Sequence, residues 1–293
     1  MPINLDVVGR RSASRTISWS SSQALLYALG VGAGGSGAHD ELAFTTDNSH
    51  GVAQRVLPTF AAVLAMRGGD GSDLGDVMNL LRGVGDVALA QILHGEQAVT
   101  LHRALPVAGA ATATGYISAI HDKGRNAVVD SVVELRDADS GEPLAETVSS
   151  LVLRGAGGFD GDPGTTPAWT APETPPDAAL SYPTRGDQAL LYRLSGDRNP
   201  LHSDPWFARS AGHDQPILHG LCTYGFAGRA LLHEVCGSDP ARFGSMSARF
   251  TSTVIPGDTL DISVWRTTEG AVFRASVGDR VVLDRGTFRL RTS

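Results

Sequence analysis

The stretch Tyr192-Arg-Leu-Ser-Gly-Asp-Arg-Asn-Pro-Leu-His202 places three polar side chains, Asp197, Asn199 and His202, within six positions. The Asn199-Pro200 step forces an extended or turn geometry that a continuous helix could not provide, so these polar groups can converge. An imidazole can exchange a proton near neutral pH while a neighbouring carboxylate orients water. The stretch therefore predicts a proton-transfer site in which Asp197 and His202 act on one water molecule.

A second stretch follows after a polar turn, Pro216-Ile-Leu-His-Gly-Leu-Cys-Thr-Tyr-Gly225. Its apolar residues have roughly helical spacing, and the pattern predicts a buried helix from Ile217 to Leu232. Gly220 lies in the first turn and has no side chain, so a ligand carbonyl could reach the free backbone N–H groups there. Developing negative charge would be stabilised at this position.

The chain contains an internal repeat, because three segments of the first half recur in the same order in the second half. The matches are Gln23-Ala-Leu-Leu-Tyr-Ala-Leu-Gly30 with Gln188-Ala-Leu-Leu-Tyr-Arg-Leu-Ser195, Leu57-Pro-Thr-Phe-Ala61 with Leu221-Cys-Thr-Tyr-Gly225, and Leu105-Pro-Val-Ala-Gly109 with Ile255-Pro-Gly-Asp258. Repeated order of this kind indicates duplication.

Each half is then expected to be an opening helix, a polar segment, a central helix and a run of strands. The strands are expected at Ala98–His102, Ala111–Ile120, Val128–Leu135, Glu146–Leu153, Met246–Thr251, Thr259–Thr267, Ala271–Val277 and Val281–Leu290. The predicted class is α+β, with a central helix wrapped by an antiparallel sheet in each half. Gly and Pro are frequent from Gly155 to Asp177, so we expect halves at residues 1–154 and 181–293 joined by a linker at 155–180.

The residues from Tyr192 to Pro205, together with His219-Gly220, resemble the motif of the type 2, (R)-specific enoyl-CoA hydratases. This is the MaoC-like branch of the hot-dog fold, and the resemblance implies a double hot-dog. It also implies that Asp197 and His202 are the catalytic pair, with Asn199 as their polar neighbour. The Gly220 N–H would form part of the hole for the thioester oxygen.

The same resemblance implies an acyl-CoA contact for His94, Gly95, Lys123 and Phe250, with Lys123 supplying positive charge to a polar group of CoA. Each of these residues also has a structural interpretation. His94 could be a loop histidine, Lys123 part of a plain hairpin turn, and Phe250 a core residue. The sequence leaves these alternatives open.

Glycines occupy the positions of the first half that align with the polar residues of the second. Gly32, Gly34 and Gly37 match positions 197, 199 and 202. The first half therefore cannot perform this chemistry, and the missing side chains are expected to leave room for a bulky acyl chain. The glycines also fit G-x-G-x-x-G, but no strand precedes them and no helix follows, so we reject a dinucleotide site.

Composition describes an ordinary water-soluble protein of 293 residues, with 42% hydrophobic and 19% charged residues. A net charge of −7 without a basic cluster disfavours nucleic-acid binding. No apolar run approaches the roughly 20 residues that span a bilayer, and no signal peptide is evident, so a cytoplasmic location is expected. The two cysteines and the histidine spacings fit neither a disulfide framework nor a metal site.

The sequence thus predicts reversible hydration of trans-2-enoyl-CoA to (R)-3-hydroxyacyl-CoA in fatty-acid metabolism, without cofactor or metal. The predicted partner is an acyl-CoA substrate, with an acyl-carrier protein as the other possible carrier, and the predicted assembly is a homodimer. Two alternatives remain open. One is a hot-dog acyl-CoA thioesterase, and the other is a non-enzymatic acyl-thioester binding protein, which would need neither Asp197 nor His202.

Overall fold

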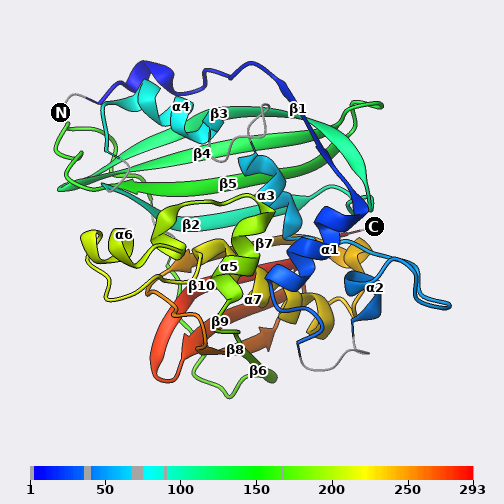
Figure 1. The fold of residues 1–293 in the computed structure, drawn as a ribbon. Coiled ribbons are helices and arrows are strands. Elements are labelled where there is room, and N and C mark those ends of the chain that lie inside the picture. Colours follow the sequence, from blue (N-terminus) through cyan, green and yellow to red (C-terminus); the bar gives the residue numbers. More distant parts are fainter. Residues whose placement is uncertain (1–2, 36–40, 68–74, 89–90, 166–167, 293) are drawn as a thin grey trace.

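A single antiparallel sheet of ten strands forms the frame of the protein (Figure 1). The structure is a computed structural model that describes residues 3–35, 41–67, 75–88, 91–165 and 168–292. Within these residues the strand order is β1-β3-β4-β5-β2-β7-β10-β9-β8-β6. The strands are β1 Arg15–Trp19, β2 Ile92–Leu101, β3 Gly109–Lys123, β4 Asn126–Asp137, β5 Pro143–Leu153, β6 Ala178–Pro183, β7 Phe243–Phe250, β8 Thr259–Arg266, β9 Gly270–Val277 and β10 Arg280–Leu290.

The two halves meet at β2 and β7, where Glu96–Thr100 pairs with Ser245–Arg249. One central helix from each half lies against the sheet. Helix α3 contacts β4 and β5, and α7 contacts β6, β7, β8 and β10. The helices are α1 Ser21–Gly30, α2 Leu42–Thr45, α3 Phe60–Met66, α4 Gly75–Val84, α5 Gln188–Tyr192, α6 Pro205–Ser210 and α7 Gly220–Glu234. The predicted architecture, a central helix wrapped by an antiparallel sheet and present twice, is confirmed.

Helix α7 is the longest helix that the structure describes, and every residue from Leu221 to Leu232 is buried. Its close packing depends on a missing side chain at Gly228, where a Cβ atom would lie 2.4 Å from Cγ2 of Thr59. The helix begins at Gly220, three residues later than predicted. Leu218 is held in an extended segment instead, since its N–H donates to the carbonyl of Val254 at 2.7 Å.

All eight predicted strands are present, and the structure adds β1 and β6. Strand β6 begins at Ala178 and pairs with β8, so residues 178–180 of the expected linker belong to the sheet. Strand β2 begins at Ile92, well before the predicted Ala98. A bulge between His94 and Glu96 breaks the alternation from which a strand is read in sequence.

The expected free volume beside the glycines of the first half is absent at Gly32. A Cβ atom there would lie 2.3 Å from Cε1 of Phe226 and 3.0 Å from Nη1 of Arg229, so side chains of α7 already fill the space. Gly32 and Gly34 both have positive φ, 78° and 73°, in the turn after α1. Gly37 lies outside the described residues. The prediction that these glycines make room for an acyl chain is therefore wrong for Gly32.

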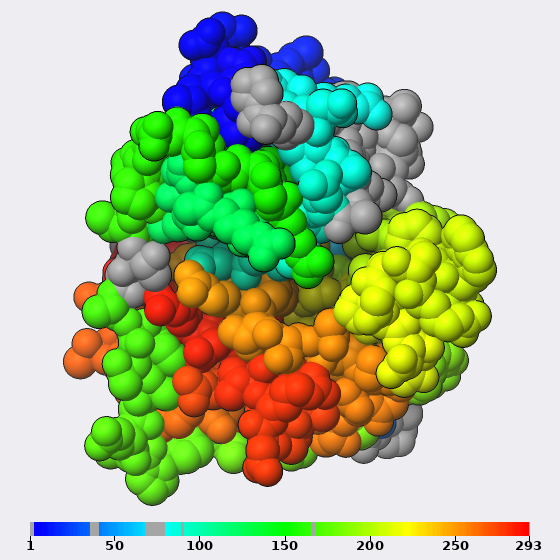
Figure 2. Space-filling view, turned by 90° about the vertical axis from the view of Figure 1, so that its left-hand side faces the viewer, coloured from blue at the N-terminus to red at the C-terminus, as the bar shows by residue number. Residues whose placement is uncertain are grey.

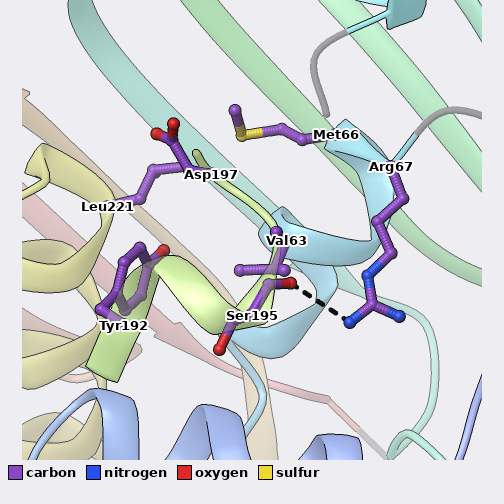
Figure 3. A pocket seen from close by; sticks show the side chains of 8 residues that line it. Val63, Met66, Arg67, Tyr192, Ser195, Asp197 and Leu221 are labelled. Atoms are coloured by element: carbon purple, nitrogen blue, oxygen red, sulfur yellow. Dashed lines mark hydrogen bonds between the residues drawn. The ribbon is translucent and has the colours of Figure 1, made fainter. Parts of the chain in front are cut away.

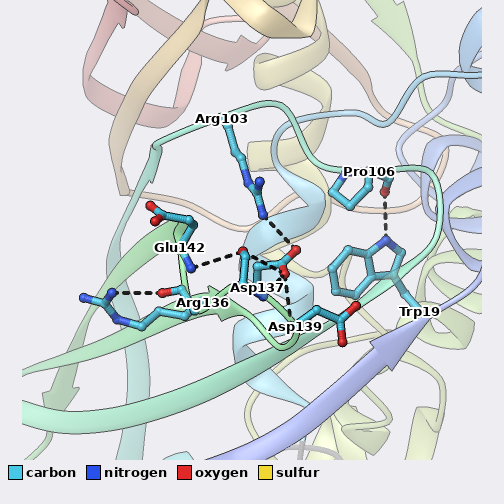
Figure 4. Close-up of polar contacts among 9 residues, drawn as sticks. Trp19, Arg103, Pro106, Arg136, Asp137, Asp139 and Glu142 are labelled. Atoms are coloured by element: carbon cyan, nitrogen blue, oxygen red, sulfur yellow. Dashed lines mark hydrogen bonds and ion pairs between the residues drawn. The ribbon is translucent and has the colours of Figure 1, made fainter.

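An aspartate stabilises the loops at each end of the first-half sheet by accepting backbone N–H groups. Asp122 accepts backbone N–H groups of Gly158 and Phe159, which fixes the start of the linker, and these bonds hold the pKa of Asp122 below its usual value. At the opposite end, Asp137 closes the β4–β5 hairpin and pairs with Arg103 at 2.7 Å (Figure 4).

Among the described helices, none has both the length and the apolar character needed to cross a bilayer.

A buried ion pair ties the polar segment of the first half to α7. The Glu41 carboxylate lies 2.9 Å from Nε of Arg229, 2.8 Å from Nε2 of His233 and 2.8 Å from the N–H of Gly34. The side chains of Glu41 and Arg229 are only 6% and 2% exposed. Burial would raise the pKa of Glu41, but the bond from His233 and the charge of Arg229 outweigh it and lower the pKa.

We expect Glu41→Gln to destabilise the protein by about 3–5 kcal/mol, because the buried charge of Arg229 would lose the carboxylate that pairs with it. Urea unfolding monitored by circular dichroism measures the change. The matched control is Glu269→Gln, which breaks a pair with Arg289 whose side chains are both 69% exposed. The control should cost less than about 1 kcal/mol, and equal losses in the two variants would contradict the role of the buried pair.

Candidate active site

The loop after α5 positions Asp197 and His202 through two short-range hydrogen bonds of Asn199. The backbone N–H of Asn199 donates to Oδ1 of Asp197 at 3.0 Å. The side-chain Oδ1 of Asn199 accepts the N–H of Leu201 at 3.0 Å and caps the 3₁₀ turn Pro200–His202. Asn199 therefore builds the loop, and the pairing of one carboxylate with one imidazole follows from that geometry.

The tautomer of His202 follows from its backbone partner. Nδ1 lies 2.9 Å from the carbonyl oxygen of Ile217, which can only accept, so Nδ1 carries the proton and Nε2 keeps a lone pair. The residue is 8% exposed. Burial lowers the pKa of His202 from its usual 6.5, although the charge of Asp197 acts in the opposite direction. His202 is consequently a neutral base with one free nitrogen.

A second imidazole ring, that of His219, stacks on His202 with the ring centroids 3.7 Å apart and the planes inclined by 26°. The carboxylate of Asp197 and ring nitrogens of both histidines lie within 4.8 Å of one another, a spacing that a metal ion could bridge. Nearly parallel rings, however, direct their in-plane lone pairs along separate planes, and these cannot converge on one ion. The geometry favours an acid–base cluster over a metal centre.

The N-terminus of α7 lies beside this cluster. The carbonyl of His219 already accepts the N–H groups of Cys222 and Thr223, and the first N–H groups of a helix have no intrahelical acceptor. The Phe250 ring covers Gly220, since a Cβ atom on Gly220 would lie 3.2 Å from Cε1 of Phe250. A carbonyl that approached the N–H of Gly220 from the cavity would meet the positive end of the helix dipole.

Both halves line one cavity of about 440 Å³ that contains Asp197, Asn199, His202 and Gly220. Figure 2 shows the surface hollowed between the first half in green, the α6 region in yellow and the segment near residue 250 in orange. The apolar wall includes Met66, Leu81, Ile92, Leu93, Leu151, Leu201, Ile217, Leu218, Leu221, Phe250, Val254 and Val282. In Figure 3 the side chain of Met66 approaches Asp197 from α3.

His94 enters the cavity from β2 and lies against Phe250, with ring centroids 5.0 Å apart. Burial lowers the pKa of His94 to about 4, and the nearby charge of Asp197 only partly offsets this effect. His94 is therefore neutral, and its Nε2 atom is buried without a partner among the described residues. This arrangement suits a hydrogen bond to a ligand better than the alternative of a solvated loop histidine.

The predicted ligand-binding residues separate into two groups in space. His94 and Phe250 line the cavity, and Gly95 forms the bulge of β2 beside them. Lys123 ends β3 at an exposed hairpin and is not among the residues that line this cavity, whereas Arg154 is. Residues that the sequence did not assign to the site include Met66, Arg154 and His219; of these only His219, next to Gly220, had a local signal.

Comparison with known proteins identifies the family. Two family models match consecutive parts of the chain, the MFE-2 hydratase 2 N-terminal domain over residues 18–155 and the MaoC like domain over residues 168–284. The chain belongs to the MaoC-like hydratase and dehydratase family. It is 48% identical over 299 residues to the 3-hydroxyacyl-thioester dehydratase Y of Mycobacterium tuberculosis, and the match covers 98% of each chain.

Further similarity supports both the family and the fold. The peroxisomal enoyl-CoA hydratase 2 of Arabidopsis thaliana is 36% identical over 87% of this chain and 84% of its own. A MaoC-like dehydratase structure from Phytophthora capsici superposes with a TM-score of 0.88 at 32% identity over 99% of both chains. A Mycobacterium tuberculosis protein described as a double hotdog matches with a TM-score of 0.54 over 95% and 96% of the chains; at 17% identity it supports the fold alone. The predicted double hot-dog is confirmed.

The electrostatic coupling of the pair can be tested without any substrate. We expect NMR to show the His202 ring titrating below 6.5 in the wild type. Asp197→Asn removes the charge that raises the pKa of His202, so the pKa should fall further. Asp204→Asn, which changes the cap of α6 two residues away, is the control and should leave the titration unchanged. A higher pKa in Asp197→Asn would contradict the coupling.

Proposed function

We propose that this protein catalyses the reversible addition of water to trans-2-enoyl-CoA, which gives (R)-3-hydroxyacyl-CoA. One observation carries the proposal: the carboxylate of Asp197 and the free Nε2 of His202 lie in the same cavity as the N-terminus of α7. The family membership supports hydro-lyase chemistry on a thioester. The (R) configuration comes from the family, since the geometry alone does not identify the face of the alkene that is presented.

In the proposed reaction Asp197 and His202 hold one water molecule. Its oxygen forms a bond to C3 while a proton passes to Nε2 of His202, and the π electrons move toward the thioester oxygen. The N–H of Gly220 at the start of α7 stabilises that enolate-like oxygen. The protonated Nε2 of His202 then gives this proton to C2, so that the elements of one water molecule are added and His202 regains its neutral state.

The two halves have different tasks in this proposal. The second half, with Asp197, Asn199, His202 and Gly220, carries the chemistry. The first half supplies His94 and the apolar residues of the cavity wall, and we propose that it binds the acyl chain. A cytoplasmic location and a homodimer stay predictions.

Two other functions would use the same cavity. A thioesterase would also bind an acyl thioester, but its product is a free thiol, so thiol release distinguishes it. A binding protein without activity would not need a neutral imidazole beside a carboxylate. The decisive experiment is loss of enoyl absorbance with crotonyl-CoA and decenoyl-CoA, followed by chiral analysis of the product and a thiol assay on the same samples.

We expect Asp197→Asn and His202→Ala each to lower turnover by about 10² or more, since either change removes one side of the water-binding pair. Their combination should cost little more than one change, because the pair acts as a unit. Circular dichroism and melting temperature verify the fold. Near-wild-type turnover in either folded variant would refute the assignment.

The cavity wall of the first half predicts tolerance of long acyl chains. Decenoyl-CoA should have a kcat/KM at least as high as crotonyl-CoA, because each buried methylene contributes up to roughly 0.8 kcal/mol. Ile92→Trp narrows the cavity and should lower the decenoyl-to-crotonyl ratio. Leu5→Trp, at an exposed position in the turn Leu5–Val7, is the control. An unchanged decenoyl-to-crotonyl ratio in Ile92→Trp would show that the acyl chain does not bind against this part of the cavity wall.

Charge at the cavity indicates where the phosphates of CoA bind. Asp197 is the one carboxylate among the residues that line the cavity, although the chain carries a net charge of −7. Arg154 lines the same cavity at an exposed position, and the hydroxyl residues Thr251, Ser252 and Thr253 lie on its wall. A guanidinium binds phosphate oxygens in pairs. We therefore propose Arg154 ahead of Lys123 as the cation for a CoA phosphate.

Three crotonyl thioesters separate these candidates, those of CoA, of 4′-phosphopantetheine and of pantetheine. Arg154→Ala should raise KM for the CoA thioester by about tenfold, the loss of one charged hydrogen bond, and leave the pantetheine thioester unchanged. The 4′-phosphopantetheine thioester, whose arm CoA shares with acyl-carrier proteins, shows which phosphate is involved. Lys123→Ala is the matched comparison. A larger rise in KM for the CoA thioester in Lys123→Ala than in Arg154→Ala would indicate that Lys123 binds the phosphate.

A further inference from the structure

The ring of His219 packs against the rings of His202 and Tyr192 at the start of α7, yet no step of the proposed reaction uses it. Its face stacks on His202 at 3.7 Å, and the ring of Tyr192 packs against it with centroids 4.8 Å apart. Its Nε2 atom lies 3.1 Å from the backbone carbonyl oxygen of Asp197. The residue is 1% exposed and caps α7 immediately before Gly220.

These contacts fix the protonation of the ring. The carbonyl of Asp197 can only accept, so Nε2 of His219 must carry the proton in that hydrogen bond. Burial, and next the positive charge that His202 acquires, hold the pKa of His219 well below 6.5. Nδ1 is left without a proton, and it is buried without a partner among the described residues. His219 is thus a neutral ring with a single tautomer.

We propose that His219 is a positioning residue that fixes Asp197 and His202 relative to each other and to the N-terminus of α7. The stack restricts the imidazole of His202 to the plane in which Nε2 faces the cavity. The hydrogen bond holds the backbone of Asp197, and with it the carboxylate. Both contacts come from the residue that precedes Gly220, so one ring aligns the base, the carboxylate and the N–H group that receives the thioester oxygen.

Neutrality of His219 is required by the same arrangement. In the proposed reaction His202 accepts a proton, and a second positive charge stacked at 3.7 Å would oppose that transfer. Among the described residues, the other charged or titratable groups that face the two rings are Asp197, Arg193, His213 and Tyr192. Of these, Asp197 favours the protonated form of His202, and His213 disfavours it.

Two substitutions separate the two contacts. His219→Phe keeps a flat ring against His202 but removes the hydrogen bond to the Asp197 carbonyl. His219→Gln keeps an N–H donor at a similar reach but removes the stacked ring. This inference rests on the proposed hydration activity, which Asp197→Asn and His202→Ala test independently.

We expect kcat for crotonyl-CoA to fall by about tenfold or more in both variants, while KM changes less than threefold. In His219→Gln, water can reach the uncovered face of His202, so the acidic limb of the kcat/KM profile should move up toward pH 6.5. In His219→Phe, the apolar cover remains and the acidic limb should stay in place. NMR titration of His202 in each variant measures the same shift without substrate.

The outcomes distinguish the possibilities. Lower melting temperature with unchanged kcat per folded molecule and an unmoved His202 titration would mean that His219 only supports the fold, which overturns the inference. If the wild type does not hydrate crotonyl-CoA, the proposed function fails, and the NMR titration still decides the positioning role. If neither variant folds, Tyr192→Leu, which loosens the other side of the ring, should lower kcat in the same direction; unchanged kcat there would also overturn the inference.

Discussion

The hydrogen-bonded pairing of β2 with β7 is the constraint on which the site depends. Glu96 opposes Arg249 at one end of this ladder, and beyond that pair the two strands lead to His94 and Phe250, whose rings meet at 5.0 Å. The register therefore decides which side chains of the first half face the second. A shift of one residue would turn His94 to the opposite face of the sheet and leave the cavity without one of its walls.

The same pairing explains how duplication could end in two halves of unequal chemistry. In the second half the loop after α5 carries Asp197 and His202, which reach a cavity that both halves line. In the first half the corresponding turn carries Gly32, packed against Phe226, and the pair Glu41–Arg229 fills the space between that turn and α7. Polar side chains are present in both places, but among the described residues of the first-half segment Glu41 is already bound by Arg229, His233 and the N–H of Gly34.

Sequence reasoning succeeded where the signal was local. The Asp-x-Asn-Pro turn, the glycine at the start of α7 and the repeat are all read from short segments. They predicted the fold, and they predicted that Asp197, Asn199, His202 and Gly220 meet at one cavity; the catalytic role of these residues stays a proposal. It failed where position depends on contacts between distant segments. The sequence near Gly32 does not indicate that Phe226 fills the space beside it, and the sequence near Arg154 does not indicate that this residue lines the cavity. The bulge at Gly95 breaks the alternation of side chains, so the first part of β2 was not predicted as a strand.

Two neutral imidazoles, those of His94 and His202, line the cavity beside one carboxylate, and a third, that of His219, is buried behind His202. The pKa values of His94, His202 and His219 are all lowered, with burial as the largest cause. In a less polar site each remaining charge acts more strongly. With neutral histidines, the charge of Asp197 acts on a single mobile proton, and the dipole of α7 acts on the opposite end of the substrate. Burying the polar rings costs free energy, but it keeps the histidines neutral. Asp197 can then stabilise the proton on His202, and the N-terminus of α7 can stabilise the negative thioester oxygen.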